Sequence, residues 1–461
     1  MEDKVYVNRT LNLRKIRYLG FDMDHTLVRY NSSAFEQTTH ELVLDRMLAR
    51  GYPADVKKLP FDYDLAIRGL VIDKQKGNLL KVSRHGGIRA AYHGVKPVDF
   101  ATQKKEYDST YIDLRDSSRY SSIDTAFSIS LANLFMQIVD LKDSQPQLEL
   151  PDYATMAGDL IASVDLAHRD GSLKSRVRAD LARYIVKDES LVRDLERYRR
   201  HDKKLFILTN SDFHYTKLLL DYAINPFLKE HKDWSELFEI VITAAQKPRF
   251  FFDNLKFLKV NPRDGSMTNV DGKLEAGIYQ GGCASTFTND LGLDGDDILY
   301  IGDHIYGDIL RLKKDCNWRT AMVVEDLEEE VEQYREVAPI QEKIEDLMEQ
   351  KEPFEHEQVE LVSEHVEKGE SLRDARVKEL QEKIAELDRQ IGELIRKHQS
   401  HFNKYWGEVM RAGNEESYFA HQTERFACIY MAKLGDLLAY SPRTYFRAPR
   451  RPMAHEIQAR G

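Results

Sequence analysis

Short apolar runs that end in polar residues recur along this chain, and stretches with helical spacing separate them. The first run, Lys15 to Phe21, is rich in aromatic and aliphatic residues and ends at Asp22-Met23-Asp24. Runs of this kind are typical of buried strands, and their alternation with helices predicts an α/β fold with a doubly wound parallel sheet. Further runs cover residues 205–210, 238–243, 298–303 and 318–324, and we predict the last of these to be an edge strand.

The segment between the first two predicted strands has a different pattern. Residues 70–73 and 79–82 form two short apolar runs joined by Lys76-Gly77-Asn78, which predicts an antiparallel hairpin. Helical spacing surrounds this hairpin, and antiparallel and helical elements placed between parallel strands predict an inserted α+β cap domain. The predicted helices cover residues 35–50, 124–141, 153–168 and 173–200, and a second, smaller hairpin excursion is expected within 250–295.

After residue 325 the sequence becomes acidic and helical. Apolar residues recur there at spacings of three and four, a seam of under three heptads. Two interpretations remain open: a helical hairpin that folds back on its own chain, or a contact between subunits. The seam consists of Val377, Leu380, Ile384, Leu387, Ile391 and Leu394. The expected domains are a first core segment at 1–45, the cap at 46–200, a second core segment at 201–330 and a helical C-terminal region at 331–461.

Composition and charge narrow the class of protein. The 461 residues carry a formal net charge of −10, which disfavours nucleic-acid binding by bulk attraction to phosphates. The three cysteines form no Cys-x-x-Cys pair, so neither a disulfide framework nor a zinc site is expected. No apolar signal segment follows Met1, and no run approaches the ~18 apolar residues of a membrane-spanning helix. We therefore expect a cytoplasmic protein without membrane partners; its basic end (Arg443, Arg447, Arg450, Arg451) is more typical of a solvated tail than of a docking segment.

Polar residues stand at the ends of four predicted strands. Because the carboxyl ends of parallel strands meet at one edge of a sheet, these residues can converge on one site. Each has an ordinary alternative, a turn, a surface residue or a helix cap, but their joint occurrence in this order is hard to explain by chance. The residues are Asp22 and Asp24, Thr209 and Asn210, Lys247, and Asp303 with Asp308.

This set matches what cleavage of a phosphate ester requires: a nucleophile, neutralised phosphate charge and a protonated leaving group. Asp22 is the candidate nucleophile and would form an aspartyl-phosphate, while Asp24 would act as general acid and base. Two close carboxylates favour a bound cation, and Mg²⁺ suits oxygen ligands and phosphates. Thr209, Asn210 and Lys247 would hold the phosphoryl oxygens. Asp22, the backbone carbonyl of Asp24 and Asp303 would hold the metal, and Asp308 would place the metal waters or Lys247.

These residues lie in runs that resemble the four motifs of the haloacid dehalogenase-like superfamily. More narrowly, the sequence is similar to the IMP/GMP-preferring cytosolic purine 5′-nucleotidases across nearly its whole length. The resemblance implies a Rossmann-like core with a cap, Mg²⁺ as cofactor and a homo-oligomer, a tetramer in that family. The runs are Asp22-Met23-Asp24-His25-Thr26-Leu27, Thr209-Asn210-Ser211, Tyr184-Ile185-Val186-Lys187-Asp188, Gln246-Lys247-Pro248-Arg249-Phe250-Phe251 and residues 298–308.

The resemblance also implies a pocket for a purine base in the cap. Phe127 matches an aromatic residue that stacks on the base, and Asp165, His168 and Lys174 match polar contacts to its edge; Ser211 joins the phosphate-binding set. Without the resemblance each of these would read as an ordinary helix-surface residue. One departure is Ile161, which stands where the family pattern has an arginine, and it bears on base recognition.

An effector site for a purine nucleotide, ATP or GTP, is implied as well. Phe426 and Cys428 replace a tyrosine and an aspartate expected there, so the identity of the effector stays open. The positions that resemble this site are Asp124, Tyr306, Lys314, Gln422 and Arg425.

The sequence therefore predicts a Mg²⁺-dependent 5′-nucleotidase that hydrolyses IMP, GMP and their deoxy forms, with phosphotransfer to a second nucleoside as a side reaction. Two alternatives are a phosphatase of the same superfamily acting on another phosphorylated metabolite, and a non-catalytic nucleotide-sensing module. The presence of both a candidate nucleophile and a candidate acid argues against the sensing module, because binding alone requires neither.

Overall fold

A computed structural model describes residues 4–107, 112–369, 374–453 and 455–456 of the chain. The chain divides into two compact units, Met1–Glu325 with Met410–Gly461, and Asp326–Val409. The first unit contains the sheet predicted from the strand runs, and the second contains the predicted C-terminal helices.

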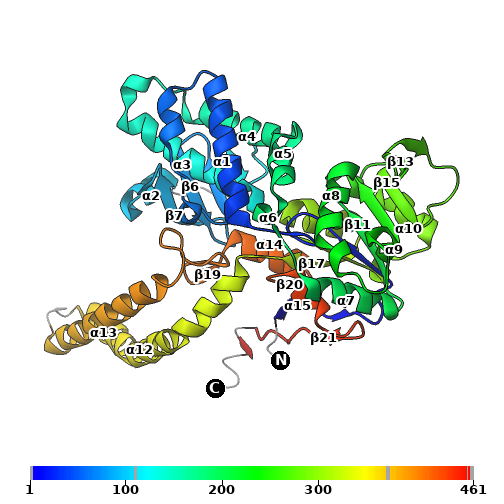
Figure 1. Cartoon of the computed structure of the whole chain (residues 1–461). Helices are drawn as coiled ribbons and strands as arrows, with labels where there is room; N and C mark the ends of the chain where they lie inside the picture. The colour runs from blue at the N-terminus through cyan, green and yellow to red at the C-terminus, as the bar shows by residue number, and fades with distance from the viewer. Residues whose placement is uncertain (1–3, 108–111, 370–373, 454, 457–461) are drawn as a thin grey trace. The chain divides into compact units, whose positions relative to one another are not determined.

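The main sheet has ten strands in the order β1-β20-β17-β16-β3-β11-β12-β15-β13-β14. Figure 1 labels some of them, among them β11, β13 and β15. Pairing is parallel from β20 through to β15, and the strands beyond these at either end are antiparallel to their neighbours. The expected α/β class with a doubly wound parallel sheet is confirmed. The strands are β1 (Val5–Val7), β3 (Tyr18–Phe21), β11 (Lys204–Leu208), β12 (Ile240–Thr243), β13 (Phe257–Val260), β14 (Met267–Asn269), β15 (Gly277–Gly281), β16 (Ile298–Gly302), β17 (Arg319–Val323) and β20 (Ile429–Met431).

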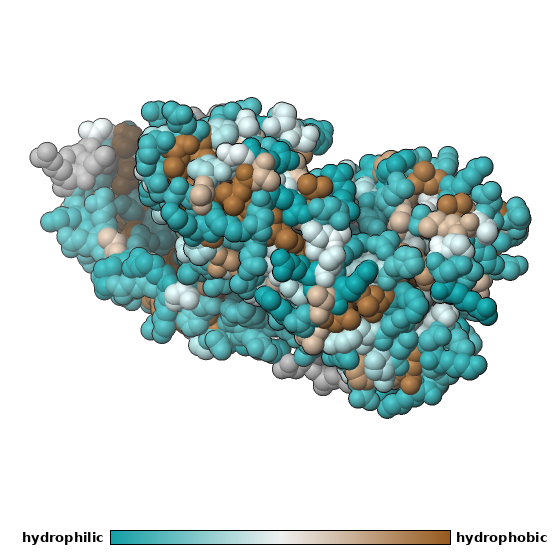
Figure 2. Space-filling view, turned by 45° about the horizontal axis from the view of Figure 1, so that its top comes forward, coloured by the Kyte–Doolittle hydropathy of each residue, from teal (hydrophilic) through white to brown (hydrophobic). Residues whose placement is uncertain are grey.

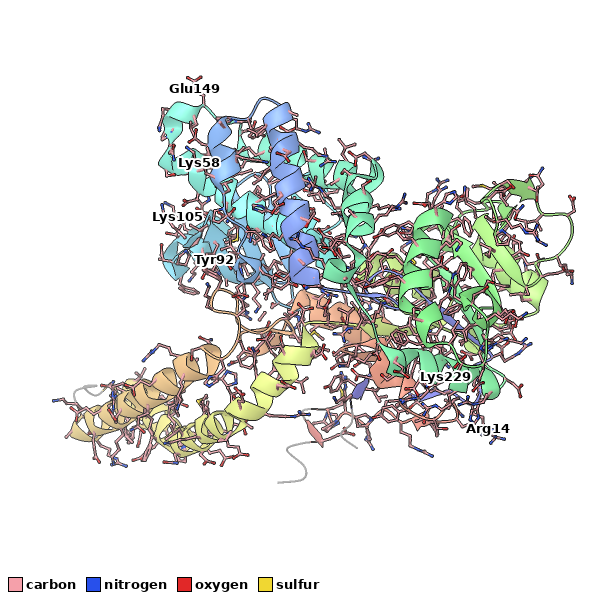
Figure 3. All side chains as sticks on the ribbon, in the orientation of Figure 1. Arg14, Lys58, Tyr92, Lys105, Glu149 and Lys229 are labelled. Atoms are coloured by element: carbon pink, nitrogen blue, oxygen red, sulfur yellow. The ribbon has the colours of Figure 1, made fainter. Side chains whose placement is uncertain are left out.

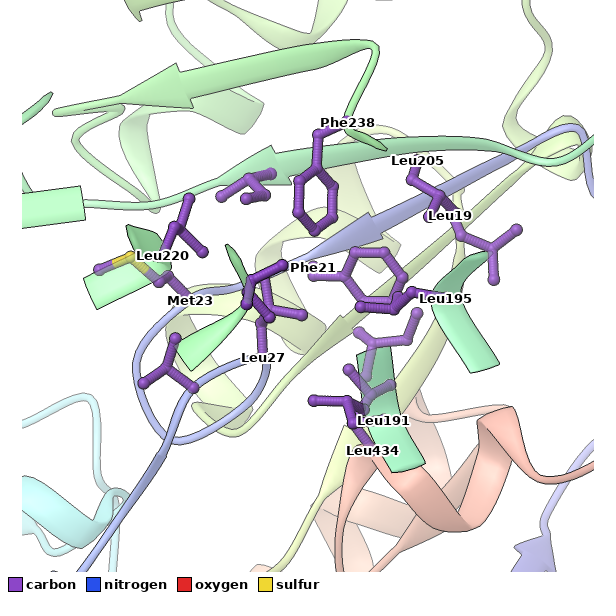
Figure 4. Packing of buried hydrophobic residues seen from close by; sticks show 14 of the residues in the cluster. Leu19, Phe21, Met23, Leu27, Leu191, Leu195, Leu205, Leu220, Phe238 and Leu434 are labelled. Carbon is purple, nitrogen blue, oxygen red and sulfur yellow. The ribbon is translucent and has the colours of Figure 1, made fainter. Parts of the chain in front are cut away.

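Both faces of this sheet are buried. On β3, Leu19 and Phe21 belong to one apolar cluster, shown in Figure 4, and Tyr18 belongs to another. Helices α7 (Glu189–Arg200) and α8 (Phe213–Ala223) contribute to the first cluster, while α10 (Ala284–Leu291) and α11 (Arg311–Asp315) contribute to the second. Burial on both faces explains why these strands read as nearly continuous apolar runs.

Gly20 lies on the same face of β3 as Tyr18 and leaves room for a neighbouring ring. A Cβ atom at this position would lie 2.1 Å from Cζ of Phe206 on β11. A side chain there would clash with the buried Phe206 ring, so the glycine allows this ring to pack directly against β3.

The inserted region carries its own antiparallel sheet, in the order β8-β7-β6-β5-β9. The predicted hairpin is confirmed, since β5 pairs antiparallel with β6. The strands are β5 (Leu70–Asp73), β6 (Asn78–Val82), β7 (Ile88–His93), β8 (Lys96–Pro97) and β9 (Tyr120–Ser122), and the helices are α1 (Ser32–Ala49), α2 (Phe100–Tyr107), α3 (Ile129–Ser144), α4 (Tyr153–Arg169), α5 (Ser172–Ala179) and α6 (Leu181–Tyr184).

The single helix predicted over 173–200 is wrong. The chain forms α5 and α6, then the short strand β10 (Ile185–Val186), and only then α7. β10 pairs antiparallel with β4 (Arg29–Tyr30). Tertiary pairing thus overrides helical spacing at the point where the chain returns to the main sheet.

The prediction that residues 318–324 form an edge strand is also wrong. β17 lies between β16 and β20, and β20 comes from the last part of the chain. Residues after 409 therefore return to the first unit, where they also contribute α14 (Tyr418–Phe426), α15 (Leu434–Leu438), the pair β18 (Arg411–Ala412) and β19 (Glu415–Glu416), and β21 (Tyr445–Phe446) paired with β2 (Leu11–Asn12). The structure limits the separate helical region to 326–409 instead of 331–461.

The second unit is a pair of helices, α12 (Leu327–Lys368) and α13 (Ala375–Gln399). The pair is antiparallel, because Lys351 pairs with Asp388 while Glu357, further along α12, pairs with Arg376. Three residues of the predicted seam, Val377, Leu380 and Ile391, are buried. The interpretation as a helical hairpin is confirmed.

Hydrophilic residues cover most of the face seen in Figure 2, and the hydrophobic patches on it are small. Lys58, Lys105 and Glu149 are among the exposed charged side chains of the inserted region (Figure 3). Among the described residues, no helix has both the length and the apolar character needed to cross a membrane.

Candidate active site

Four neighbouring parallel strands, β16, β3, β11 and β12, end at the same edge of the main sheet. Phe21 of β3 is level with Ile301 of β16, and the backbone N–H of Asp22 donates to the Ile301 carbonyl at 2.8 Å. Asp22 is thus held where β3 leaves the sheet. The predicted residues at the ends of the other strands therefore lie along this edge.

Lys247 links two of the predicted carboxylates. Its Nζ lies 2.7 Å from Oδ1 of Asp22, 2.7 Å from Oδ1 of Asp308 and 2.9 Å from the Tyr300 hydroxyl. Burial disfavours the ammonium, but the two carboxylates outweigh burial and raise the Lys247 pKa. Lys247 therefore carries its positive charge inside the protein at any physiological pH.

The positive charge of Lys247 does not balance the negative charges around Asp22. Burial raises the Asp22 pKa, Lys247 opposes this effect, and Asp308, Asp303 and Asp24 add to the rise. One ammonium thus faces several carboxylates in a region where solvent does not screen them. An additional cation would restore the ionised form of Asp22.

Asp303 and Asp308 provide the remaining carboxylates. Oxygens of Asp22, Asp303 and Asp308 all lie within 4.8 Å of one another. Asp308 is buried against Gly302, where a Cβ atom would lie 2.5 Å from its Oδ2. Oδ2 of Asp303 is buried and has no hydrogen-bond partner among the described residues. A buried carboxylate oxygen without a partner, next to two further carboxylates, suits an oxygen-binding divalent cation.

Asp24 is bound by two hydroxyl groups. Tyr30 donates to its Oδ1 at 2.6 Å, and Ser211 donates to its Oδ2 at 3.0 Å. The Tyr30 oxygen also lies 3.0 Å from the Tyr215 hydroxyl. Burial, followed by the charge of Asp24, raises the Tyr30 pKa, so this phenol stays protonated.

The residues that follow β11 order the loop around Lys247. The side-chain amide of Asn210 donates to the Lys247 carbonyl at 3.1 Å and accepts from the Lys247 N–H at 2.6 Å. Thr209 is buried, and its hydroxyl accepts from the Ser211 N–H at 3.0 Å. Asn210 and Ser211 are thus occupied by Lys247 and Asp24, a use that the sequence did not indicate.

The structure brings two of the four predicted base-contacting residues together. Phe127 lies edge-on to His168, with ring centroids 5.4 Å apart, and to His25, at 4.4 Å. Burial lowers the His168 pKa to about 4, so its imidazole is neutral near pH 7. Lys174 instead pairs with Asp212 at 2.7 Å and lies over the Tyr215 ring, and Asp165 is exposed on α4.

Two of the positions predicted for an effector, Lys314 and Arg425, lie over the ring of Phe426. Lys314 lies 5.5 Å and Arg425 lies 5.3 Å from the centroid of Phe426. Tyr306 is 48% exposed. Asp124 accepts from the Ser122 hydroxyl at 2.6 Å, and Gln422 shares helix α14 with Arg425. Two of the five predicted effector positions thus lie over one largely buried ring, that of Phe426.

Sequence reasoning missed Tyr30, Tyr215 and Tyr300. Tyr300 donates to the Leu208 carbonyl at 3.0 Å and lies beside Lys247. Tyr30 donates to Asp24, and Tyr215 contacts the Tyr30 hydroxyl. Tyr300 read as part of an apolar strand, and Tyr215 as part of a helix. The only available signal was the position of Tyr30, six residues after Asp24.

Comparison with known proteins gives consistent results along the whole chain. The sequence profile described as the 5′ nucleotidase family matches residues 5–458. Human 5′-nucleotidase domain-containing protein 2 is 28% identical over 472 residues, which cover 98% of this chain and 85% of that protein. A 5′-nucleotidase domain-containing protein of Dictyostelium discoideum is 27% identical over 467 residues, covering 98% and 75%.

Solved structures of other proteins match as well. A predicted phosphoglycolate phosphatase from Haemophilus somnus has a TM-score of 0.30 and 13% identity, covering 67% of this chain and 86% of its own. A haloacid dehalogenase-like family hydrolase from Xanthomonas campestris has a TM-score of 0.26 and 9% identity, covering 67% and 82%. The profile match over residues 5–458 is the decisive finding: the chain belongs to the 5′-nucleotidase family and is a phosphoric monoester hydrolase.

Proposed function

We propose that the protein is a Mg²⁺-dependent 5′-nucleotidase that hydrolyses purine nucleoside monophosphates, IMP, GMP and their deoxy forms, to nucleoside and phosphate. The observation that carries the proposal is the ion pair of Asp22 and Lys247, whose Oδ1 and Nζ lie 2.7 Å apart, beside the carboxylates of Asp303 and Asp308. A carboxylate at a strand end can attack phosphorus, and the ammonium beside it can neutralise charge on the phosphoryl oxygens.

The reaction proceeds in two displacements. In the first, an Asp22 oxygen attacks phosphorus, the bond from phosphorus to the nucleoside 5′-oxygen breaks, and Asp24 gives a proton to that oxygen. In the second, water attacks the phosphorus of the aspartyl-phosphate, Asp24 takes the water proton, and the bond from phosphorus to Asp22 breaks. If a hydroxyl of a second nucleoside replaces the water, the product is a new phosphate ester.

The residues at the sheet edge fit a divalent cation. Asp22, Asp303 and the backbone carbonyl of Asp24 would hold Mg²⁺, which when bound would neutralise charge on the transferring phosphoryl group. Oδ1 of Asp308 lies 2.7 Å from Nζ of Lys247, so Asp308 orients the ammonium group and would not itself bind the substrate. Asn210 accepts a hydrogen bond from the backbone N–H of Lys247, and the Thr209 hydroxyl accepts one from the backbone N–H of Ser211.

A base-binding role for the inserted region rests on Phe127 and His168. Phe127 is only partly buried and adjoins a neutral His168, so an aromatic face and an uncharged edge are available together. A carbonyl or N–H on the edge of a purine can pair with a neutral imidazole. Lys174 would join only after it leaves Asp212, whereas Asp165 is already exposed on α4.

Activation by a purine nucleotide is the second part of the proposal. The Phe426 ring with Lys314 and Arg425, and Tyr306 beside the loop that carries Asp303, would form the effector site. Because Tyr306 and Asp303 belong to one short segment, an effector there can alter the order of the site. Assembly into a homo-oligomer is kept as an expectation from the resemblance.

The test is phosphate release from a panel of nucleoside monophosphates and base-free esters, with Mg²⁺ or with EDTA, and with or without ATP and GTP. We expect the highest kcat/KM for IMP and GMP, loss of turnover in EDTA and recovery with Mg²⁺. A preference for a base-free metabolite would overturn the nucleotide substrate while leaving the hydrolase assignment intact. Full activity in EDTA would overturn the metal dependence.

A further inference from the structure

The hydrogen bonds of Asp24 form a directed chain. The Tyr30 hydroxyl has one proton, and the 2.6 Å contact assigns that proton to Oδ1 of Asp24. The Tyr215 hydroxyl, 3.0 Å from the Tyr30 oxygen, must then be the donor in the second contact. The order is therefore Tyr215 to Tyr30 to Asp24, and it ends on the carboxylate next to the proposed nucleophile.

Tyr30 stands at the point where the chain leaves the main sheet. It lies in β4, opposite Ile185 of β10, and the Asn31 N–H donates to the Tyr184 carbonyl at 2.7 Å. Helix α1 of the inserted region begins at Ser32, and α7 of the core follows β10. The two-stranded ribbon of β4 and β10 thus consists of the outgoing and returning connections, and Tyr30 belongs to it.

The ring of Tyr30 is fixed independently of its hydroxyl. It stacks on His25, with centroids 4.7 Å apart and planes 16° apart, and Phe35 meets it edge-on at 5.1 Å. The ring is buried, at 3% exposure. A phenylalanine at this position would keep these ring contacts and lose only the hydroxyl.

We propose that Tyr30 is a positioning residue whose hydroxyl sets the orientation of the Asp24 carboxyl for proton transfer. The inference rests on the proposed function, in which Asp24 gives a proton to the leaving oxygen and later takes one from water. A carboxyl that loses one of its two hydroxyl donors turns more freely and spends less time aimed at the reacting oxygen. Only the steps in which Asp24 gives or takes a proton should slow.

The experiment compares Tyr30→Phe with the wild-type full-length chain on two base-free esters that differ in the acidity of the leaving group, phenyl phosphate and p-nitrophenyl phosphate. Losing a hydrogen bond to a charged group predicts a roughly 10- to 100-fold fall in the single-turnover rate of phenol release from phenyl phosphate, which reports the first displacement alone. On p-nitrophenyl phosphate, whose leaving group needs little protonation, the fall should be under about threefold.

Tyr52 offers a matched control. Its hydroxyl donates to Asp159 at 2.9 Å, and neither residue belongs to the proposed substrate site. Tyr52→Phe removes the same kind of bond, and it should leave the ratio of the two rates unchanged. The second measurement adds Tyr30→Phe to Asp24→Asn. If Tyr30 acts through Asp24, the double variant should be no slower than Asp24→Asn alone.

Equal losses on both esters, or no loss on either, would overturn the inference, and so would losses that multiply in the double variant. The proposed role of Asp24 is tested separately. If Asp24→Asn itself hydrolyses phenyl phosphate at the wild-type rate, the acid function is wrong. If Asp24→Asn is slow and Tyr30→Phe is not, only the positioning role fails.

Discussion

The two ends of the proposed substrate site are built differently. At the phosphate end, Asp22, Lys247 and Asp308 follow strand ends or their loops, and ion pairs of 2.7 Å join them. At the base end, Phe127 and His168 come from separate elements of the inserted region and meet only through ring contacts. Strand ends and ion pairs fix the first group, whereas side-chain packing fixes the second. The phosphate end should therefore be intolerant of change, and the base end should be adjustable.

The sharpest test of the phosphate end is Asp22→Asn. The amide is nearly the same size but a poor nucleophile, so we expect phosphate release to fall by roughly 10⁴-fold or more on every ester. Folding should be retained, as monitored by circular dichroism, because the backbone N–H of Asp22 still pairs with Ile301. Near-normal release by the purified variant would rule out the covalent route.

The base end is tested by Phe127→Ala. Loss of one stacking surface costs ~1–3 kcal/mol, so KM for IMP and GMP should rise roughly 5- to 150-fold. KM and kcat for p-nitrophenyl phosphate should change little, because that ester has no purine. A similar loss on both substrates would mean that Phe127 supports the packing of His25 and Phe35 and that the two ends are not separable.

The proposed effector site, which contains Lys314 and Arg425 over the Phe426 ring, is a third region to compare. Lys314→Ala should remove activation by ATP or GTP, which coupling energies of 1–3 kcal/mol place at roughly 5- to 150-fold in apparent affinity for substrate. Arg311 pairs with Asp315 on the same helix, and Arg311→Ala serves as a matched loss of a cation beside this site. The measurement is the initial rate at sub-saturating IMP. Activation retained in full by Lys314→Ala would remove this residue from the effector site.

The smallest expected effect concerns stability against acid. The His168 pKa is about 4 in the fold, against 6.5 for an unperturbed histidine, because burial disfavours its charge. Between pH 4 and pH 6.5 the unfolded chain binds more protons at this histidine than the folded chain does. The stability that comes from the neutral His168 is therefore fully present above about pH 6.5 and is lost as pH falls towards 4. The loss at pH 5 is about 2 kcal/mol. Urea unfolding at pH 5 and 7.5 should therefore show a weaker pH dependence in His168→Phe than in the wild type, and an unchanged dependence would place the imidazole in solvent.

The two ends also differ in what the sequence could predict. Asp22, Lys247, Asp303 and Asp308 were found because strand ends are local signals and the rule for parallel sheets places them together. Tyr215 could not be found in this way, since its contact with Tyr30 spans 185 residues and leaves no pattern in its own helix. The same limit explains the wrong helix over 173–200, where pairing of β10 with β4 depends on residues far back in the chain.

The position of β20 has a consequence for how the protein is made. Met431 of β20 pairs with Val5 of β1 on one side and with Val323 of β17 on the other. During synthesis β1 emerges first and β17 much later, and each has an unpaired edge until more than a hundred further residues have left the ribosome. Exposed strand edges are templates for association with other chains. Nascent chains stopped before Ile429 should therefore aggregate more readily than full-length chains, and a chaperone that shields strand edges should act late in translation.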